Sequence, residues 1–341
     1  TLARMAVAAL DDFRHWSDRY PGVSGFRTAG FLVLLGQGNT EQAKANVAMQ
    51  TAEGANVEAL FENDLARLVP GLRTDDVGVG AYEPDSGYAD PWLTTSSLVD
   101  GARALGATVA LQTKVHSIRI GSGGRVAGVE TSQGSVDAPI VLNATGSWAD
   151  RLSRPLGIPL PVTPQRESIV VFDLPPSIET LPIIADLVRL DYFRPDGNRR
   201  VLFGDEDHTQ TSIHPALAEP EPGGSDSVSQ SAVENAAEKL SHRLPAFGEA
   251  SFGSSGYTGC YEVTPDFQPV IGGPAEIPGY WYAAGFSGHG FKLTPVVGRL
   301  IAEWAADGAP SIPLDLFHVS RFAEGRTIEP AHPYRTAHGL I

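Results

Sequence analysis

The chain has 341 residues and a mass of 36.1 kDa, which is enough to bury one large hydrophobic core or two moderate ones. Its 25 basic and 40 acidic residues give a formal net charge of −15, which opposes binding to nucleic acids and to anionic membranes. The single cysteine, Cys260, excludes an internal disulfide and a cysteine-rich metal site, and no stretch has the roughly 20 apolar residues of a membrane span. These features predict a soluble, cytoplasmic, enzyme-like protein with no metal site.

The first part of the chain predicts helices separated by one buried strand. Apolar residues recur at helical spacing from the start, which predicts a helix over 1–20. The apolar run 31–35 lies between glycines and is typical of a short buried strand, and further helices are predicted over 40–54 and 58–68. Because the pattern opens directly on a helix, we expect the chain to begin inside a fold, as a piece of a longer sequence.

The middle of the chain combines helices with two groups of strands. A helix is predicted over 91–106, and a compact β unit follows it. The last strand of this unit contains Ile140–Leu142 and is almost wholly apolar, so we expect it to be buried on both faces. Residues 160–215 predict an antiparallel sheet, 219–229 an exposed loop and 230–243 a helix. The expected strands of the β unit cover residues 108–111, 115–120, 126–131 and 136–144.

The most informative stretch is Gly285–Lys292, in which three glycines accompany His289 and Lys292 just before an amphipathic helix. We expect Thr294 to cap this helix and Pro295 to stand in its first turn. A helix N-terminus carries about half a positive charge, so cations placed there favour an anionic or electron-rich ligand between them. Glycines would let that ligand approach the backbone closely.

Three segments, in this order along the chain, resemble motifs of the D-amino-acid-oxidase-like FAD oxidoreductases, and sarcosine oxidases most of all. Asn143–Asp150 resembles the family's second flavin-contacting turn, and Val263–Gly272 resembles its Thr-Pro-Asp strand and turn. Ala283–Lys292 is similar to the motif at the flavin edge of sarcosine oxidases. The resemblance extends through nearly all of the chain, but the family's opening strand, Gly-x-Gly-x-x-Gly turn and helix are missing from it.

The resemblance implies a fold of the α/β plus α+β class. In it, an incomplete FAD-binding Rossmann-like domain is interleaved with an antiparallel-sheet substrate-binding domain. The FAD-binding domain, without its first βαβ unit, is expected over residues 1–22, 86–157 and 253–310. The substrate-binding domain is expected over 23–85 and 158–252, and a C-terminal tail over 311–341.

The resemblance also implies roles for single residues. Lys292 matches the residue that binds the substrate carboxylate in sarcosine oxidases, His289 a residue beside the flavin, and Tyr261 a tyrosine that borders the substrate. The alternatives are a surface lysine, a core histidine and an ordinary strand tyrosine. Val115 is expected to meet the adenine of FAD through its backbone. All residues expected to contact FAD are Val115, Ala144, Thr145, Gly146, Trp148, Gly285, Ser287, Gly288, His289, Gly290, Phe291 and Lys292.

Two departures from the sarcosine oxidase pattern change what we expect of the cofactor. The cysteine that carries FAD covalently in monomeric sarcosine oxidases has its place at Gly259, one residue before Cys260, so FAD is expected to be bound non-covalently. The lysine that promotes reaction with O₂ has its place at Leu202. The electron acceptor therefore stays open between O₂ and another protein, with a dehydrogenase favoured.

The implied activity is oxidation of the C–N bond of an amino acid or an N-methylated amine by hydride transfer to FAD, which gives an imine that hydrolyses. The alternative is a non-catalytic fragment or subunit of the same fold that cannot bind FAD alone. A serine hydrolase is a third interpretation, because Gly285–His289 nearly matches the Gly-x-Ser-x-Gly elbow around Ser287. In that motif, however, glycine is required where His289 stands.

Overall fold

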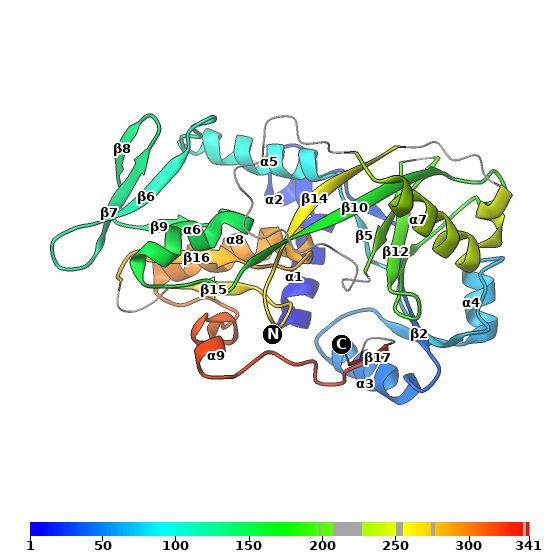
Figure 1. Ribbon diagram of the computed structural model, residues 1–341. Coiled ribbons are helices and arrows are strands. Elements are labelled where there is room, and N and C mark those ends of the chain that lie inside the picture. Colours follow the sequence, from blue (N-terminus) through cyan, green and yellow to red (C-terminus); the bar gives the residue numbers. More distant parts are fainter. Residues whose placement is uncertain (198, 207–226, 250–254, 274–276, 337–338, 341) are drawn as a thin grey trace.

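The computed structural model describes residues 1–197, 199–206, 227–249, 255–273, 277–336 and 339–340. Figure 1 shows an elongated arrangement, with a small meander of strands at one end and a large sheet at the other. Helices α1 (Leu2–Arg14) and α8 (Gly290–Asp307) lie between these two parts and pack against each other. Helices and sheets are mixed along the chain, as the sequence predicts.

Eight strands form the largest sheet, in the order β14-β10-β13-β12-β11-β2-β4-β3. Only β11 and β2 are parallel neighbours, and every other pair is antiparallel. The antiparallel sheet predicted over 160–215 is thus confirmed up to residue 206, beyond which residues 207–226 lie outside the described part. The strands are β2 (Phe31–Gly36), β3 (Glu58–Leu60), β4 (Val77–Glu83), β10 (Thr163–Asp173), β11 (Ile183–Asp186), β12 (Asp191–Asp196), β13 (Arg200–Asp205) and β14 (Ser255–Val263).

Helices α4 (Glu62–Leu68) and α7 (Gln230–Arg243) contribute to the core on one face of this sheet. The amide of Ala232 donates to Oγ of Ser229 over 3.2 Å, which satisfies one of the free N–H groups at the start of α7. Leucines of both helices pack with buried apolar side chains of six strands, and each fully buried side chain stabilises the fold by about 1.5–3 kcal/mol. The helix predicted over 230–243 is confirmed.

A smaller sheet has the order β15-β16-β9, where β16 and β9 are parallel. Successive residues of a strand point to opposite faces, and Val270 and Ile271 in β15 accordingly join different clusters. Ile271 packs with α1 and α8, whereas Val270 packs with Ala149 and Ile118 on the other side. The elements concerned are β9 (Val141–Asn143), β15 (Val270–Gly272), β16 (Tyr280–Ala284) and α6 (Ala149–Ser153).

The meander at the end of the molecule consists of β6 (Val115–Ile120), β7 (Val126–Thr131) and β8 (Gly134–Asp137). The strands predicted over 115–120 and 126–131 are confirmed. The prediction of a strand over 108–111 is wrong, because those residues have no regular secondary structure. The strand predicted over 136–144 is interrupted between β8 and β9 at Pro139, which has no N–H for a strand ladder.

The expectation that both faces of β9 are buried is wrong. Ile140 and Leu142 are 45% and 43% exposed. Strand β9 stands at the edge of its sheet, with β16 as its neighbour, and the described part of the chain supplies no second neighbour. Apolar composition alone does not distinguish such an edge strand from a central one.

The predicted helices are largely confirmed, with shifted ends. The helix expected over 1–20 divides at His15 into α1 and α2 (Trp16–Arg19), and the segment 58–68 begins with β3 before α4. Thr294 does not cap α8, because this helix begins at Gly290 with His289 in the capping position and Pro295 lies inside it. The other helices are α3 (Thr40–Ala52) and α5 (Pro91–Ala104), with the short helices η2 (Arg154–Leu156) and η3 (Pro245–Glu249).

The C-terminal part of the chain runs back past the smaller sheet through η4 (Asp315–Phe317) and α9 (Ser320–Ala323) to a short hairpin beside α3 (Figure 1). The side-chain amide of Asn39 donates to the carbonyl of Arg335 over 2.9 Å and accepts from its N–H over 2.8 Å, which fixes the hairpin there. The remaining strand pairs are β1 (Arg27–Thr28) with β5 (Gly87–Tyr88), and β17 (Arg335–Thr336) with β18 (Gly339–Leu340).

The domain boundaries stay a prediction. Strand β14, placed by the sequence in the FAD-binding domain, pairs along its whole length with β10 of the large sheet. In the part of the chain that the structure describes, no helix combines the length and apolar character that crossing a bilayer requires.

Candidate functional site

The candidate site lies where two neighbouring parallel strands end. Asn143 in β9 stands opposite Tyr282 in β16, so the carboxyl ends of both strands meet at one edge of the sheet. Beyond β9 the chain turns through η1 (Gly146–Trp148), and beyond β16 it turns through 285–289 into α8. In open α/β sheets, ligands bind in the crevice outside the carboxyl ends of the strands.

Asn143 fixes the first turn. Its buried amide nitrogen lies 2.9 Å from the carbonyl of Ala149 and 3.0 Å from both Oγ of Ser153 and Oη of Tyr280. Its carbonyl oxygen accepts from Oγ1 of Thr145 over 2.7 Å. The turn is therefore held from inside, while Ala144, Thr145 and Trp148 stay exposed on its outer side. This role of Asn143 was not predicted from the sequence.

The second turn needs glycine at two positions. Gly285 and Gly288 have φ angles of +70° and +82°, in the left-handed region. A Cβ atom at Gly285 would lie 2.3 Å from Cγ2 of Thr264, and one at Gly288 would lie 2.6 Å from the ring of Tyr261. The backbone is thus in direct contact with both neighbours, and Gly288 is exposed on its free side.

Ser287 is buried and serves the geometry of this turn. Its Oγ accepts from the amide of Thr264 over 3.2 Å and donates to the carbonyl of Gly285 over 3.1 Å. Because its proton is held by a carbonyl oxygen rather than by a general base, Ser287 lacks the activation that a nucleophilic serine needs. The arrangement therefore does not support the hydrolase interpretation.

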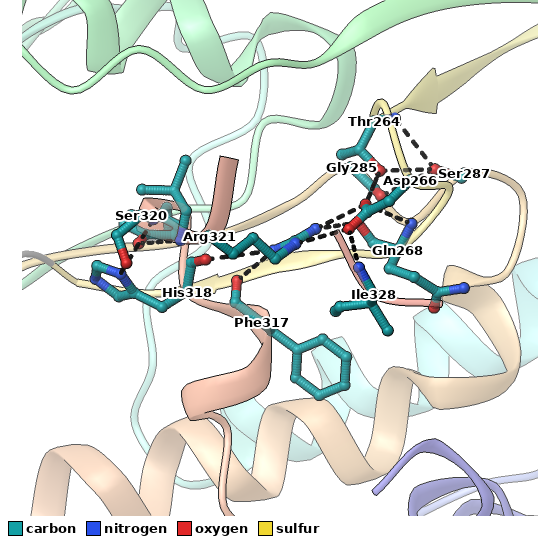
Figure 2. A network of polar contacts seen from close by, with 12 residues as sticks. Thr264, Asp266, Gln268, Gly285, Ser287, Phe317, His318, Ser320, Arg321 and Ile328 are labelled. Atoms are coloured by element: carbon teal, nitrogen blue, oxygen red, sulfur yellow. Dashed lines mark hydrogen bonds and ion pairs between the residues drawn. The ribbon is translucent and has the colours of Figure 1, made fainter. Parts of the chain in front are cut away.

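Figure 2 shows the polar network that carries this turn. Arg321 in α9 binds Asp266 through Nε over 2.8 Å and through Nη2 over 2.9 Å, and both side chains are almost fully buried. Oγ1 of Thr264 lies 3.3 Å from Oδ1 of Asp266 and donates to the carbonyl of Gln268 over 2.7 Å. Through Thr264 the network reaches Ser287, so a segment that the sequence assigns to the tail holds the turn in place. The sequence contains no pattern that singles out Arg321.

Lys292 stands in the first turn of α8, where its side chain is exposed to water. Surrounding protein nevertheless desolvates the ammonium group and lowers its pKa, while the carboxylates of Glu83 and Glu206 act in the opposite direction. A partly desolvated ammonium group is suited to bind an anionic group of a small molecule through a charge-assisted hydrogen bond. Glu83 and Glu206 were not among the predicted site residues.

Tyr261 lies on β14 with its ring against Gly288. Burial raises the pKa of Tyr261, and the pKa of Tyr192, whose hydroxyl is hydrogen-bonded to that of Tyr261, is raised in the same way. Both phenols are therefore protonated near neutral pH. Tyr192 is a further member of the site that was not predicted, since no neighbouring residue in the sequence indicates its contact with Tyr261.

The other predicted residues divide between the site and the periphery. His289 is exposed in the capping position of α8, and its amide donates to the carbonyl of Phe286 over 2.8 Å. Gly290 and Phe291 follow in the first turn, where the Phe291 ring lies 5.8 Å from that of Phe13. Val115 begins β6 in the separate meander, and its contact with a cofactor stays a prediction. Within the described ranges, no three His, Cys, Asp or Glu side chains gather as a possible metal site.

A comparison with known protein families shows to which family the chain belongs. The model of the DAO family, described as FAD dependent oxidoreductase, matches residues 1–304. The chain belongs to this family. The DAO family consists of FAD-dependent oxidoreductases, and the similarity of this chain to sarcosine dehydrogenase confirms the resemblance found in the sequence.

Several curated proteins are similar to this family member. Mitochondrial sarcosine dehydrogenase of Homo sapiens is 25% identical over 308 residues, which cover 89% of this chain and 33% of that protein. FAD-dependent oxidoreductase domain-containing protein 1 of Bos taurus is 27% identical, with 88% of this chain and 67% of that protein covered. The chain thus spans about a third of the length of the sarcosine dehydrogenases that it matches.

Solved structures share the fold. L-proline dehydrogenase from P. horikoshii superposes with a TM-score of 0.84 at 24% identity, covering 95% of this chain and 84% of that one. Glycine oxidase from Geobacillus kaustophilus gives a TM-score of 0.76 at 24% identity, covering 94% and 81%. These likenesses confirm the expected fold class.

The residues at the two turns fit an FAD-type ligand. Gly146 and Gly288 present backbone without side chains at the strand ends, and each touches a residue of β14 on its other side. Oε2 of Glu262, which lies beside Gly146, is buried and has no hydrogen-bond partner within the described residues. A buried carboxyl oxygen without a partner is costly, which indicates that a ligand group completes this part of the site.

Proposed function

We propose that this chain carries out FAD-dependent oxidation of the C–N bond of a small amino acid or N-methylated amine. The position of Lys292 supports the proposal most strongly, because this exposed residue stands directly after the glycine turn and its ammonium group is desolvated by surrounding protein. Relatives named for sarcosine and dimethylglycine point to the same substrate class. When bound, FAD supplies the acceptor for the hydride that leaves the carbon beside the substrate nitrogen.

The side chains around the turn would bind and orient the substrate. Lys292 would hold the carboxylate by a charge-assisted hydrogen bond, which fixes the molecule at one end. Tyr261, protonated and packed on Gly288, would border the substrate and can donate a hydrogen bond. Holding the amine in one orientation lowers the entropic part of the barrier.

The first turn of α8 would act on the cofactor. Free N–H groups at Gly290 and Phe291 and the positive end of the helix dipole stabilise negative charge placed against them. His289 in the capping position would lie beside the flavin, with Ala144, Thr145, Gly146 and Trp148 on the opposite turn. These contacts depend mainly on backbone geometry, so side chains at the exposed positions could vary.

Replacing Lys292 with methionine tests the proposed function. We expect a carboxylate-bearing amine to bind about 10- to 100-fold more weakly, because a hydrogen bond to a charged group contributes about 1.5–3 kcal/mol. The affinity is measured from the change in the flavin visible spectrum of the FAD-loaded protein during titration. Bound FAD should stay near the wild-type level.

The matched control is Lys44→Met, which removes an exposed surface lysine in α3. It should leave the affinity for the amine unchanged. Equal affinity of the Lys292→Met variant and wild type would contradict the assignment of Lys292. A folded wild-type protein that stays colourless with FAD would instead support the non-catalytic interpretation.

Non-covalent attachment of FAD is a separate prediction. Cys260 is exposed on β14 and, being next to Tyr261 in a strand, points to the opposite face of the sheet. Acid precipitation of the FAD-loaded protein should therefore leave the yellow colour in the supernatant. Colour that stays with the pellet in wild type and is lost in Cys260→Ser would show a cysteinyl link.

The electron acceptor and the cellular location are part of the proposal. Leu202, at the place of the oxygen-activating lysine, lies buried in β13, and we propose a dehydrogenase that works in the cytoplasm. Comparing the rate of flavin reoxidation by O₂ with that by a soluble dye would distinguish the two classes of acceptor.

A further inference from the structure

The side chain of Glu262 reaches both turns of the site. Its Oε1 accepts from the amide of Phe286 over 3.3 Å, and its main-chain carbonyl accepts from the amide of Ser287 over 3.1 Å. A Cβ atom at Gly146 would lie 3.2 Å from Oε2, so this oxygen rests against the backbone of the first turn. The carboxyl group therefore bridges the ends of β9 and β16.

The two carboxyl oxygens have unequal surroundings. Oε1 has a backbone donor, whereas Oε2 is buried without any hydrogen-bond partner in the described part of the chain. An unsatisfied buried polar atom costs about 1–3 kcal/mol, and more if it carries charge. Burial raises the pKa of Glu262, and the amides of Phe286 and Gly285 only partly oppose this effect.

Few charged groups face this carboxyl. On β10 the residue opposite Glu262 is Pro164, and η1 carries no titratable side chain. The turn and the start of α8 bring His289 and Lys292, both exposed. No charged side chain in the described residues contributes to the shifted pKa of Glu262. None of the described charged side chains offsets the cost of burying a negative charge here, so the surroundings favour the neutral form of Glu262 over the ionised form.

We propose that Glu262 is a cofactor-binding residue, which presents a neutral carboxylic acid whose Oε2–H donates a hydrogen bond to an acceptor atom of FAD held between the two turns. The inference rests on the proposed function for the location of FAD. A neutral acid satisfies both contacts, since its carbonyl oxygen Oε1 accepts from Phe286 while the hydroxyl is free to donate. An ionised carboxylate could only accept, and would repel the electron-rich acceptor atom.

The test uses Glu262→Gln and Glu262→Ala. Glutamine reproduces the neutral acid, with one oxygen to accept and one N–H to donate, but it does not titrate. The dissociation constant of FAD is measured by flavin fluorescence between about pH 5 and 9. In wild type it should rise with pH, approaching tenfold per unit once the carboxyl of the FAD-free protein ionises.

In the Glu262→Gln variant the dissociation constant of FAD should not change with pH, and it should stay within about threefold of the wild-type value at low pH. Glu262→Ala should bind FAD about tenfold more weakly than wild type at low pH, because the donor is lost. Glu329→Gln, an exposed carboxyl in the C-terminal segment, is the control for general pH effects and should behave as wild type.

A second readout does not depend on bound FAD. Near neutral pH, the infrared difference spectrum between the FAD-free wild type and Glu262→Gln should contain one C=O stretch of a protonated carboxylic acid, since any band from Asp191 is common to both proteins and cancels. Absence of this band from the difference spectrum, or a pH profile of wild type that matches Glu262→Gln, would overturn the role of Glu262. If the wild-type protein bound no FAD at any pH, the result would contradict both the proposed function and the role of Glu262 as a hydrogen-bond donor to FAD. If the infrared band of the protonated acid were still present, the neutral state of Glu262 would nevertheless be established.

Discussion

Replacing Arg321 with methionine is expected to lower the free energy of unfolding by about 3–5 kcal/mol. The guanidinium and the carboxyl of Asp266 are 4% and 3% exposed, and they share two hydrogen bonds of 2.8 and 2.9 Å. The same guanidinium donates to the carbonyls of Phe317 and Gln268, each over 2.9 Å. Methionine fills similar space but removes the counter-charge of the buried carboxylate and takes one hydrogen-bond donor from each of the two carbonyls. Chemical denaturation at neutral pH measures the effect.

The pH dependence provides a sharper signature of this pair. Burial alone would raise the pKa of Asp266, but hydrogen bonds from Arg321 and from the amides of Ile328 and Gln268 outweigh it and hold the pKa below its usual range. A carboxyl with a lowered pKa stabilises the fold above about pH 4, and this contribution is lost as the pH falls through the folded-state pKa. The difference between wild type and the Arg321→Met variant should therefore narrow in acid.

The control for Arg321 comes from the same segment. Arg326 forms an exposed ion pair with Glu324, and such pairs contribute about 0–1 kcal/mol. Arg326→Met should therefore be nearly neutral. If Arg321→Met destabilised the protein no more than Arg326→Met does, the network in Figure 2 would not hold the turn.

The second large effect is expected for Arg243→Met, again a loss of about 3–5 kcal/mol. Arg243 is fully buried at the end of α7, where Nε donates to Asp186 over 2.6 Å and Nη1 to Asp76 over 2.7 Å. A third bond reaches the carbonyl of Arg73 over 2.5 Å. Asp191 lies nearby without a hydrogen-bond partner in the described part, and burial together with Asp186 raises the pKa of Asp191.

Removing Arg243 therefore takes the ion-pair partner from the carboxyls of Asp186 and Asp76. Thermal or chemical unfolding measures the loss, and Arg243→Lys should recover part of it, since lysine keeps the charge but not the fork of donors. Arg200→Met breaks an exposed pair with Asp196 and should cost about 1 kcal/mol or less. Equal effects of Arg243→Met and Arg200→Met would show that these two carboxyls do not depend on Arg243.

Local patterns in the sequence predicted the elements that depend mainly on local structure. Strands β6 and β7 have the predicted ends because their apolar and polar residues alternate between glycine-rich turns. The ends of helix α7 were predicted correctly because Ser229 caps a segment with a clear helical pattern. The start of α8 was predicted five residues late, since His289 and Gly290 carry no capping signal and Thr294 does.

The candidate site was predicted in part. The glycine turns and Lys292 were recognised because their motifs are contiguous in the sequence. Glu262 and Arg321 were not, although the structure brings them to the same turn from β14 and α9. Neither has a neighbour in the sequence that would reveal its contact.

The sequence by itself determined the family, the two glycine turns, and most helices and strands, because these depend on spacing and backbone preference within a few residues. The tertiary structure decided which strand stands at an edge, which carboxyl is buried without a partner, and which segment supports the turn at Ser287. These properties depend on burial, and burial depends on residues far apart in the chain. Ile140 and Leu142 illustrate the difference, since the same apolar sequence would be buried in a central strand and is exposed in β9.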